Sequence, residues 1–230
     1  NKTMNLQNDV LKSVKKFHAH GIQVIASTIV GFDHDGPDIF QEQLDFFLKA
    51  GTPQVWVYAL QAHDGTRLKK RMIEERRYID FPESFYQAKD KQEADNWNIK
   101  HLTLIPKGFS EQEFRQGIHW LLLQLYDTKN VQTRLETLFQ DFENSQFRHH
   151  FNFPGPGVER RKLVRVFHLL RYLFLHLSRQ ERKDLRQLLR MTNKYHYPNK
   201  FKVALTQYFL ARNIRLKTLA DHKPLADHKL

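Results

Sequence analysis

The chain has 230 residues, of which 40% are hydrophobic and 27% are charged, and its formal net charge is +12. This length allows one large or two small globular domains with a core of useful size. The absence of cysteine excludes disulfides, thiolate nucleophiles and cysteine-ligated zinc or iron–sulfur sites within these residues. No apolar run approaches the roughly 20 residues of a membrane helix. No signal peptide opens the chain, so we expect a cytoplasmic protein, with peripheral attachment to a membrane as the alternative.

The first third of the sequence alternates between helical and strand patterns. Apolar residues recur every three or four positions in the helical segments, and β-branched runs separate them. The expected elements are helix 7–20, strand 22–31, helix 37–50, strand 54–60 and helix 66–77. This alternation is typical of βα units on a parallel sheet.

The strand expected at 22–31 is nearly continuous in its apolar character, which indicates burial on both faces. Two strands alone do not make a stable parallel sheet. We therefore expect the rest of the sheet upstream in a longer polypeptide or in another chain. The first residue, Asn1, is not Met, which also suggests that an upstream portion precedes it.

The remaining sequence is predicted to be mainly helical. A third strand is expected at 99–105, and Ser110 with Glu113 fits a capping box that opens a helix. Further helices are expected over 128–143, 158–177, 179–192 and 199–219. A Pro- and Gly-rich linker at 144–157 separates the first of these from the second. The predicted fold class is thus α/β over 1–106, a helical extension over 107–150 and an all-α basic region over 151–230.

Ligands of parallel α/β folds bind at the carboxyl ends of the strands. In this sequence those ends are 29–33 and 59–66, and each contains a glycine, Gly31 or Gly65, that lets a ligand approach the backbone closely. Each of these two segments is a weak signal when it is taken alone.

A more specific signal comes from longer segments taken in order. They are IVGFDHDGPDIFQEQLDFFLKAG, a strand ending at DGT and followed by RL, LIPKGFSEQEF, and a helix leading to LLLQLYD. This order resembles the C-terminal half of radical S-adenosylmethionine (SAM) enzymes, and most closely the branch with an N-terminal cobalamin-binding domain and a C-terminal helical extension. The resemblance covers roughly residues 1–145 and is absent after Pro154. Some members of that branch methylate unactivated carbons, including those of hopanoid lipids.

The resemblance implies which residues contact the cofactor. The strand ending at Gly31 would run beside the adenine of SAM, and the later strand end would close the same mouth of a partial barrel. The family usually has Leu-Pro-Gly-Thr at the later position, where this chain has His63-Asp64-Gly65-Thr66. The cofactor-binding residues so implied are Ile29, Val30, Gly31, Phe32, Asp33, Leu60, Gly65 and Thr66.

The resemblance also implies cofactors and partners. The full-length enzyme would use SAM and a [4Fe–4S] cluster to form a 5′-deoxyadenosyl radical, and would transfer a methyl group from cobalamin to a small-molecule or lipid substrate. The cluster motif, the methionine-binding glycines and the cobalamin-binding domain would lie in upstream regions of the same polypeptide. This chain would shape the SAM and substrate cavity, supply no cluster ligand, and be inactive alone.

Two alternatives belong to other functional classes. Residues 158–230 are rich in Arg and Lys, whereas residues 1–66 are close to neutral. Basic residues interleaved with aromatic ones can bind nucleic acid, and basic helices can bind anionic membranes, here through 158–219. A solvated surface or a contact with an acidic partner domain explains the same charge. The other alternative is an inactive, truncated paralogue.

Several side chains near the strand ends allow a sharper and a plainer interpretation. Asp33, His34 and Asp35 form either part of a metal site or an ordinary loop in which Asp33 hydrogen-bonds the turn or a ribose hydroxyl. His63 and Asp64 form either an acid–base pair or a polar turn. Trp56 and Tyr58 alternate on one strand, so both face the same side, where they line a cavity or pack under a helix. The pair His149-His150 offers only a fortuitous metal contact.

Overall fold

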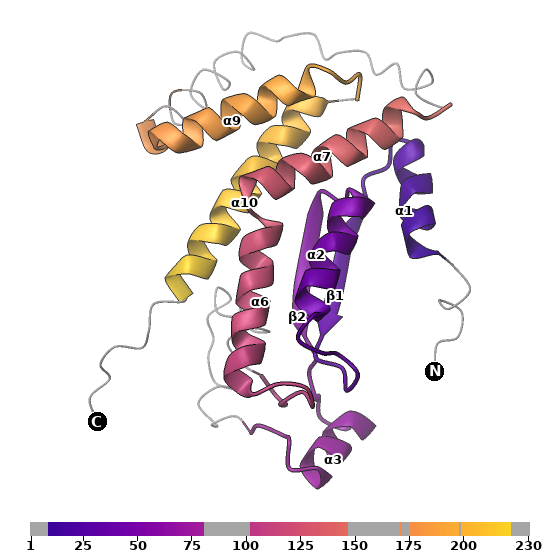
Figure 1. Cartoon of the computed structure of the whole chain (residues 1–230), viewed down its shortest axis with the longest axis vertical. Helices are drawn as coiled ribbons and strands as arrows, with labels where there is room; N and C mark the ends of the chain where they lie inside the picture. The colour runs from indigo at the N-terminus through magenta and orange to yellow at the C-terminus, as the bar shows by residue number, and fades with distance from the viewer. Residues whose placement is uncertain (1–8, 81–101, 147–170, 172–174, 198, 222–230) are drawn as a thin grey trace. The chain divides into compact units, whose positions relative to one another are not determined.

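The computed structural model describes residues 9–80, 102–146, 171, 175–197 and 199–221. Over these residues the fold is mixed α/β and mostly helical, with seven helices and one pair of parallel strands (Figure 1). The predicted combination of an α/β part and helices is confirmed at this coarse level. None of the helices in the described part combines the length and the hydropathy that a bilayer crossing needs.

The chain divides into two compact units, each built from segments that are distant in the sequence. The unit that we call the helical unit comprises 1–24, 48–53 and 126–214. The sheet unit comprises 25–47, 54–125 and 215–230. The boundaries expected from the sequence, after residues 106 and 150, stay predictions.

The sheet unit is built on strands β1 (Ile25–Val30) and β2 (Gln54–Ala59), which pair in parallel from Ile25 opposite Gln54 to Val30 opposite Ala59. Helix α2 (Ile39–Ala50) connects them. The helix begins two residues after Pro37. Pro37 was expected in the first turn of the helix, but it lies in the turn that precedes it. Thr28 on β1 donates a hydrogen bond to Gln43 on α2, with an O–O distance of 2.8 Å, so α2 lies over the Thr28 side of the sheet.

The two faces of this sheet differ in exposure. The face on the Thr28 side, called the covered face below, includes Val30, Val55, Val57 and Ala59, all of them buried. The opposite face, called the open face, carries large apolar side chains that are substantially exposed: Ile25 at 64%, Ile29 at 48%, Trp56 at 42% and Tyr58 at 36%. The prediction that β1 is buried on both faces is therefore wrong for this chain, because no second layer of described residues covers the open face.

Helices α3 (Arg67–Glu74) and α6 (Glu111–Leu125) complete the described sheet unit, and α6 packs against β2. The predicted capping box is confirmed: Glu113 N–H donates to the Ser110 hydroxyl at 3.2 Å, and the Glu113 carboxylate accepts from Ser110 N–H at 2.8 Å. These reciprocal bonds satisfy backbone donors at the start of α6.

The strand predicted at 99–105 is not formed by its described residues, 102–105. Leu104 makes an isolated antiparallel bridge with Tyr78, and residues 99–101 lie outside the described part. The apolar pattern has another cause, since Leu104 is buried in a small cluster with Ala62 and Met72. The alternation of apolar and polar residues over so short a segment indicates which side chains are buried, but it does not identify a partner strand.

The helical unit packs α1 (Val10–Ala19) against α7 (Thr128–Glu143), whose bounds match the predicted helix 128–143. The Asp141 carboxylate accepts from Lys15 Nζ at 3.0 Å, and its other oxygen lies 3.3 Å from Nδ1 of the buried His18. Phe139 is fully buried, with the rings of Tyr195 and Tyr197 at centroid distances of 5.5 and 4.9 Å. This unit therefore has an apolar core of its own.

The same unit contains α9 (Arg179–Thr192), which packs on α7, and most of α10 (Lys200–Asp221). The expected helix 179–192 is confirmed, and the one expected at 199–219 forms with slightly shifted ends. A capping box of Ser178 and Glu181 opens α9. Glu181 also accepts from Arg212 of α10 at 2.6 Å, which ties the two helices together. The helix expected at 158–177 lies largely outside the described residues.

Candidate functional site

The end of β1 requires a glycine. Gly31 has a φ of +106°, which side-chain-bearing residues rarely adopt. A Cβ at this position would lie 2.8 Å from the Phe114 ring and 3.3 Å from the Pro106 ring. Phe114 is itself packed against Phe40 and Phe109, so the ring has little room to retreat. Phe114 thereby closes the covered side of this strand end.

The loop after β1 is held by a buried carboxylate. One oxygen of Asp35 accepts hydrogen bonds from the backbone N–H groups of Gly31, at 2.7 Å, and Phe32, at 2.9 Å. Both donors are therefore engaged within the loop. His34 is exposed, its ring stacks on Phe32 at 5.9 Å, and its Nε2 lies 3.8 Å from Asp35. Among the interpretations of this segment, the hydrogen-bonded turn accounts for the role of Asp35.

Asp33 forms ion pairs with two arginines. Its oxygens lie 2.7 Å from Arg71 on α3 and 2.8 Å from Arg77. Arg77 also donates through Nε to the carbonyl of Ile105 at 2.8 Å. Partial burial alone would raise the pKa of the Asp33 carboxyl, but the hydrogen bond from Arg77 and the positive charges of both arginines outweigh it and lower that pKa below its ordinary value. Asp33 thus links the loop after β1 to the segment that contains α3.

The loop after β2 is fixed by its own contacts. Leu60 N–H donates to the Val30 carbonyl at 2.8 Å, and the Leu60 side chain packs on the Ala62 cluster. Ala62 N–H donates to the Thr103 hydroxyl at 2.6 Å. These bonds hold the end of β2 beside the end of β1, so the two predicted strand ends do meet at one edge.

Gly65 and Thr66 form the turn that leads into α3. Gly65 adopts a positive φ of +74°, and Thr66 is the N-cap of the helix. The Thr66 hydroxyl donates to the His63 carbonyl at 2.6 Å and accepts from Lys69 N–H at 3.2 Å. Asp64 forms an ion pair with Lys69. His63 and Asp64 thus take part in a turn, and their contacts do not pair them with each other.

The predicted residues therefore fall into two groups. Ile29 and Phe32 present apolar surface, whereas those that are buried or held within the loops are Val30, Gly31, Asp33, Leu60, Gly65 and Thr66. The alternation of Trp56 and Tyr58 is confirmed, and both lie on the open face beside Ile29, whose register partner is Tyr58. An apolar surface of this kind can receive a flat ring at the edge where the strands end.

Sequence reasoning missed three contributors, namely Arg71, Arg77 and Phe114. The two arginines are six residues apart and share no helical face, so no spacing rule connects them to Asp33. Phe114 belonged to an expected helical stripe, but a stripe does not say which backbone it meets. The glycine at position 31 was the signal that the sequence offered, because a residue without a Cβ permits both a positive φ and the close approach of a neighbour.

Over the part of the chain that the structure describes, no three or more His, Asp or Glu side chains gather in a way that could hold a metal ion. The pair His149-His150 lies outside the described residues.

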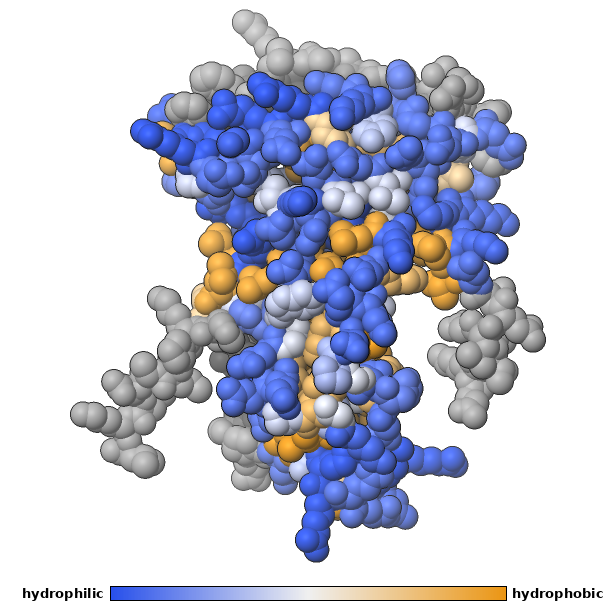
Figure 2. Space-filling model, viewed as in Figure 1, coloured by the Kyte–Doolittle hydropathy of each residue, from blue (hydrophilic) through white to orange (hydrophobic). Residues whose placement is uncertain are grey.

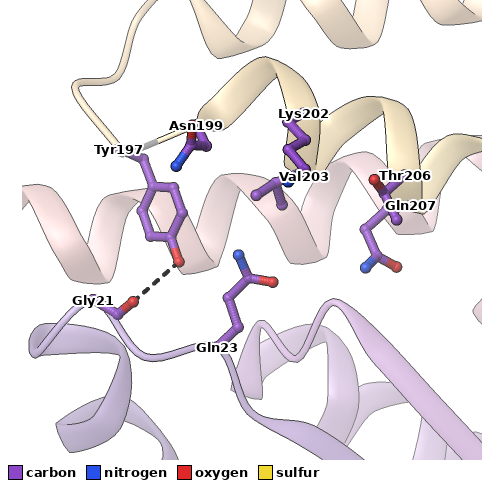
Figure 3. Close-up of a pocket in the computed structure, with 8 residues that line it drawn as sticks. All are labelled: Gly21, Gln23, Tyr197, Asn199, Lys202, Val203, Thr206 and Gln207. Carbon is purple, nitrogen blue, oxygen red and sulfur yellow. Dashed lines mark hydrogen bonds between the residues drawn. The ribbon is translucent and has the colours of Figure 1, made fainter. Parts of the chain in front are cut away.

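A separate hollow of about 350 Å³ lies within the helical unit (Figure 3). Tyr197 spans it, with its hydroxyl 3.4 Å from the Gly21 carbonyl. Gln207 is 7% exposed yet lines this space, and Gln23 lies across from it. Lys202 is the charged residue of the lining. The amides and this ammonium can hydrogen-bond a small polar molecule, but the hollow shares no residue with the strand ends.

No protein family, no curated protein and no solved structure matches this chain.

Proposed function

We propose that this chain is the C-terminal part of a radical SAM enzyme of the cobalamin-dependent methyltransferase type, in which it forms one wall of the cavity for SAM and a small-molecule or lipid substrate. The observation that carries this proposal is the open face of the β1–β2 sheet. Its side chains Ile25, Ile29, Trp56 and Tyr58 are exposed in this chain, although they are of the large apolar types that usually form buried surfaces.

The arrangement of the two faces supports a barrel wall. In parallel α/β barrels, helices cover the outside of each strand while alternate side chains point into the interior. Here α2 lies over one face of a parallel pair, and the other face is mainly apolar, with Ser27 and Gln54 as its polar members, and has no described residues over it. Parallel sheets are normally covered on both faces. Strands supplied by an upstream segment would complete the interior.

The residues at the strand ends fit part of the implied ligand. Ile29 and Phe32 offer an apolar shelf that suits an adenine ring, and Trp56 and Tyr58 would exclude water from the cavity. Asp35 fixes the loop that carries Phe32. When bound, SAM and its cluster supply the radical chemistry. The cluster ligands would come from outside these residues, since the chain has no cysteine.

The most direct test is the coding DNA upstream of Asn1. The proposal expects the same frame to continue into a Cys-x₃-Cys-x₂-Cys stretch and a cobalamin-binding region. A start codon within a few codons of Asn1, with no such frame before it, overturns the proposal. A basic binding module or an inactive remnant would then be the better account.

A biochemical test uses the polypeptide encoded by the complete frame, reconstituted without oxygen with iron and sulfide. Ile29→Asp places a charge on the expected adenine shelf, and we expect about 100-fold less 5′-deoxyadenosine from SAM, as a small misplacement of a reactant can cost. The matched control is Ile73→Asp on α3, because Ile73 is 54% exposed and lies off the open face. Equal rates for both variants would contradict a ligand at Ile29.

A further inference from the structure

Helix α9 carries a line of exposed cations. Arg179, Lys183, Arg186 and Arg190 are all exposed, and their spacings of four, three and four residues keep them on one side of the helix. At 100° per residue the four positions fall within an arc of about 60°, and at 1.5 Å per residue they extend over about 17 Å. We call these four residues the basic stripe.

No carboxylate neutralises the basic stripe within the described part of the chain. The acidic residues of α9 are engaged elsewhere: Glu181 pairs with Arg212, and Asp184 accepts from Gln180 at 2.7 Å. None of the four stripe side chains makes an ion pair among the described residues. Unpaired cations in a row repel one another, so the stripe favours an anionic partner over bare solvent.

The side of α9 opposite the basic stripe is buried in the core of the helical unit. Leu185, Leu188 and Met191 are buried, and α9 packs on α7. A helix that lies in a membrane surface needs a free apolar face to insert between the lipids. No large hydrophobic residue of α9 is exposed, and Figure 2 shows strongly hydrophilic residues where Figure 1 draws this helix. Insertion into a membrane is therefore disfavoured.

We infer that the basic stripe binds the phosphate backbone of a nucleic acid. Its length of about 17 Å equals the rise of about five nucleotides in one duplex strand. Arg and Lys side chains in a row neutralise successive phosphates without reading bases, so the binding is expected to be independent of sequence. This inference rests on α9 alone and holds whether or not the chain belongs to a radical SAM enzyme.

The test measures binding of fluorescein-labelled single-stranded RNA to the 230-residue chain by anisotropy, between 50 and 200 mM salt. The stripe variant changes all four residues to Gln. Four phosphate contacts give a salt slope of about 3 in log K against log salt, which corresponds to about 50-fold weaker binding over this range. We expect the variant to lose this portion of the slope. Circular dichroism checks that the variant stays folded, which we expect because all four substituted residues are exposed.

The matched control removes the same number of positive charges from exposed lysines that form no line, by changing to Gln the residues Lys16, Lys49, Lys70 and Lys129. Both variants lower the net charge equally. Strong binding by the control and weak binding by the stripe variant supports the inference. Equal loss in both variants would show a net-charge effect and overturn it. Binding to phosphatidylserine vesicles with no binding to RNA or duplex DNA would also overturn it.

Discussion

The two faces of the β1–β2 sheet are both mainly apolar, but they differ in their exposure to solvent. On β2, Val55 and Val57 of the covered face are 1% and 6% exposed, whereas their neighbours Trp56 and Tyr58 on the open face are 42% and 36% exposed. A sheet with one solvated face normally alternates apolar with polar residues. Four of the six residues on the open face are large and apolar, and the polar ones are Ser27 and Gln54, so the composition of these strands favours burial on both sides.

The largest expected effect on stability comes from removing the buried ring of Phe114, which packs against the end of β1. Phe114 is 1% exposed and fills the space against Gly31, so Phe114→Ala should lower the free energy of unfolding by about 3–5 kcal/mol through lost burial and a cavity. Urea unfolding followed by circular dichroism measures this loss. Trp120→Ala on the same helix is the control, because Trp120 is 37% exposed and should cost about 1 kcal/mol or less. Similar losses for both would mean that α6 does not pack as described.

The next largest effect on stability is expected from a substitution at the end of β1, at Gly31. Gly31→Ala must adopt a φ of +106° and push its methyl group against Phe114, which we expect to cost about 2–3 kcal/mol. Gly36→Ala, five residues later in the same loop, meets nothing within 4 Å and should change stability by about 0.5 kcal/mol or less. The difference between the two unfolding midpoints is the measurement. A neutral Gly31→Ala would show that the loop relaxes away from Phe114.

Two neighbouring residues compare the faces directly. Val57→Ala on the covered face should cost about 2 kcal/mol, because it removes buried methyl groups. Tyr58→Ala on the open face should cost about 1 kcal/mol or less in this chain, although it removes a larger side chain. If Tyr58→Ala were the more destabilising, the open face would be covered in solution, by a second copy or by another segment. Sedimentation of the unmutated chain would separate these two cases.

Local signals in the sequence were enough to predict most helices. The Ser110–Glu113 capping box placed the start of α6, and the apolar stripe of 128–143 gave α7 with its observed bounds. Both signals act within one or two helical turns, where backbone donors and side-chain spacing decide the structure. The predicted strand at 99–105 failed because a strand needs a partner, and its local pattern could not name one.

The candidate site was predictable only in its position. The carboxyl ends of parallel strands meet at one edge, so residues after β1 and β2 were expected together, and Leu60 N–H does bond to the Val30 carbonyl. What each side chain does there depends on distant residues. Arg77 reaches Asp33 over 44 positions of sequence, and no periodicity encodes such a contact.

The smallest effect tests the ion pairs that link the loop after β1 to α3. The pKa of Asp33 in the folded protein is lowered from its ordinary value of 3.8, so its ionised form stabilises the fold at higher pH. This contribution is fully present above pH 3.8 and is lost as the pH falls through the lowered pKa. Asp33→Asn should therefore cost about 1 kcal/mol or less at pH 7, because ion pairs that solvent still reaches contribute little.

The same variant should unfold with less pH dependence below pH 4 than the unmutated chain, since the group that takes up a proton on unfolding is gone. Urea midpoints measured between pH 7 and pH 3 check this sign. Asp38→Asn, which removes an exposed carboxylate close by in the sequence, is the matched control for the loss of one acidic side chain. If Asp33→Asn keeps the acid dependence of the unmutated chain, Arg71 and Arg77 do not hold Asp33 in solution. The loop after β1 would then be held by the hydrogen bonds that Asp35 accepts from Gly31 and Phe32 and by the packing of Gly31 against Phe114.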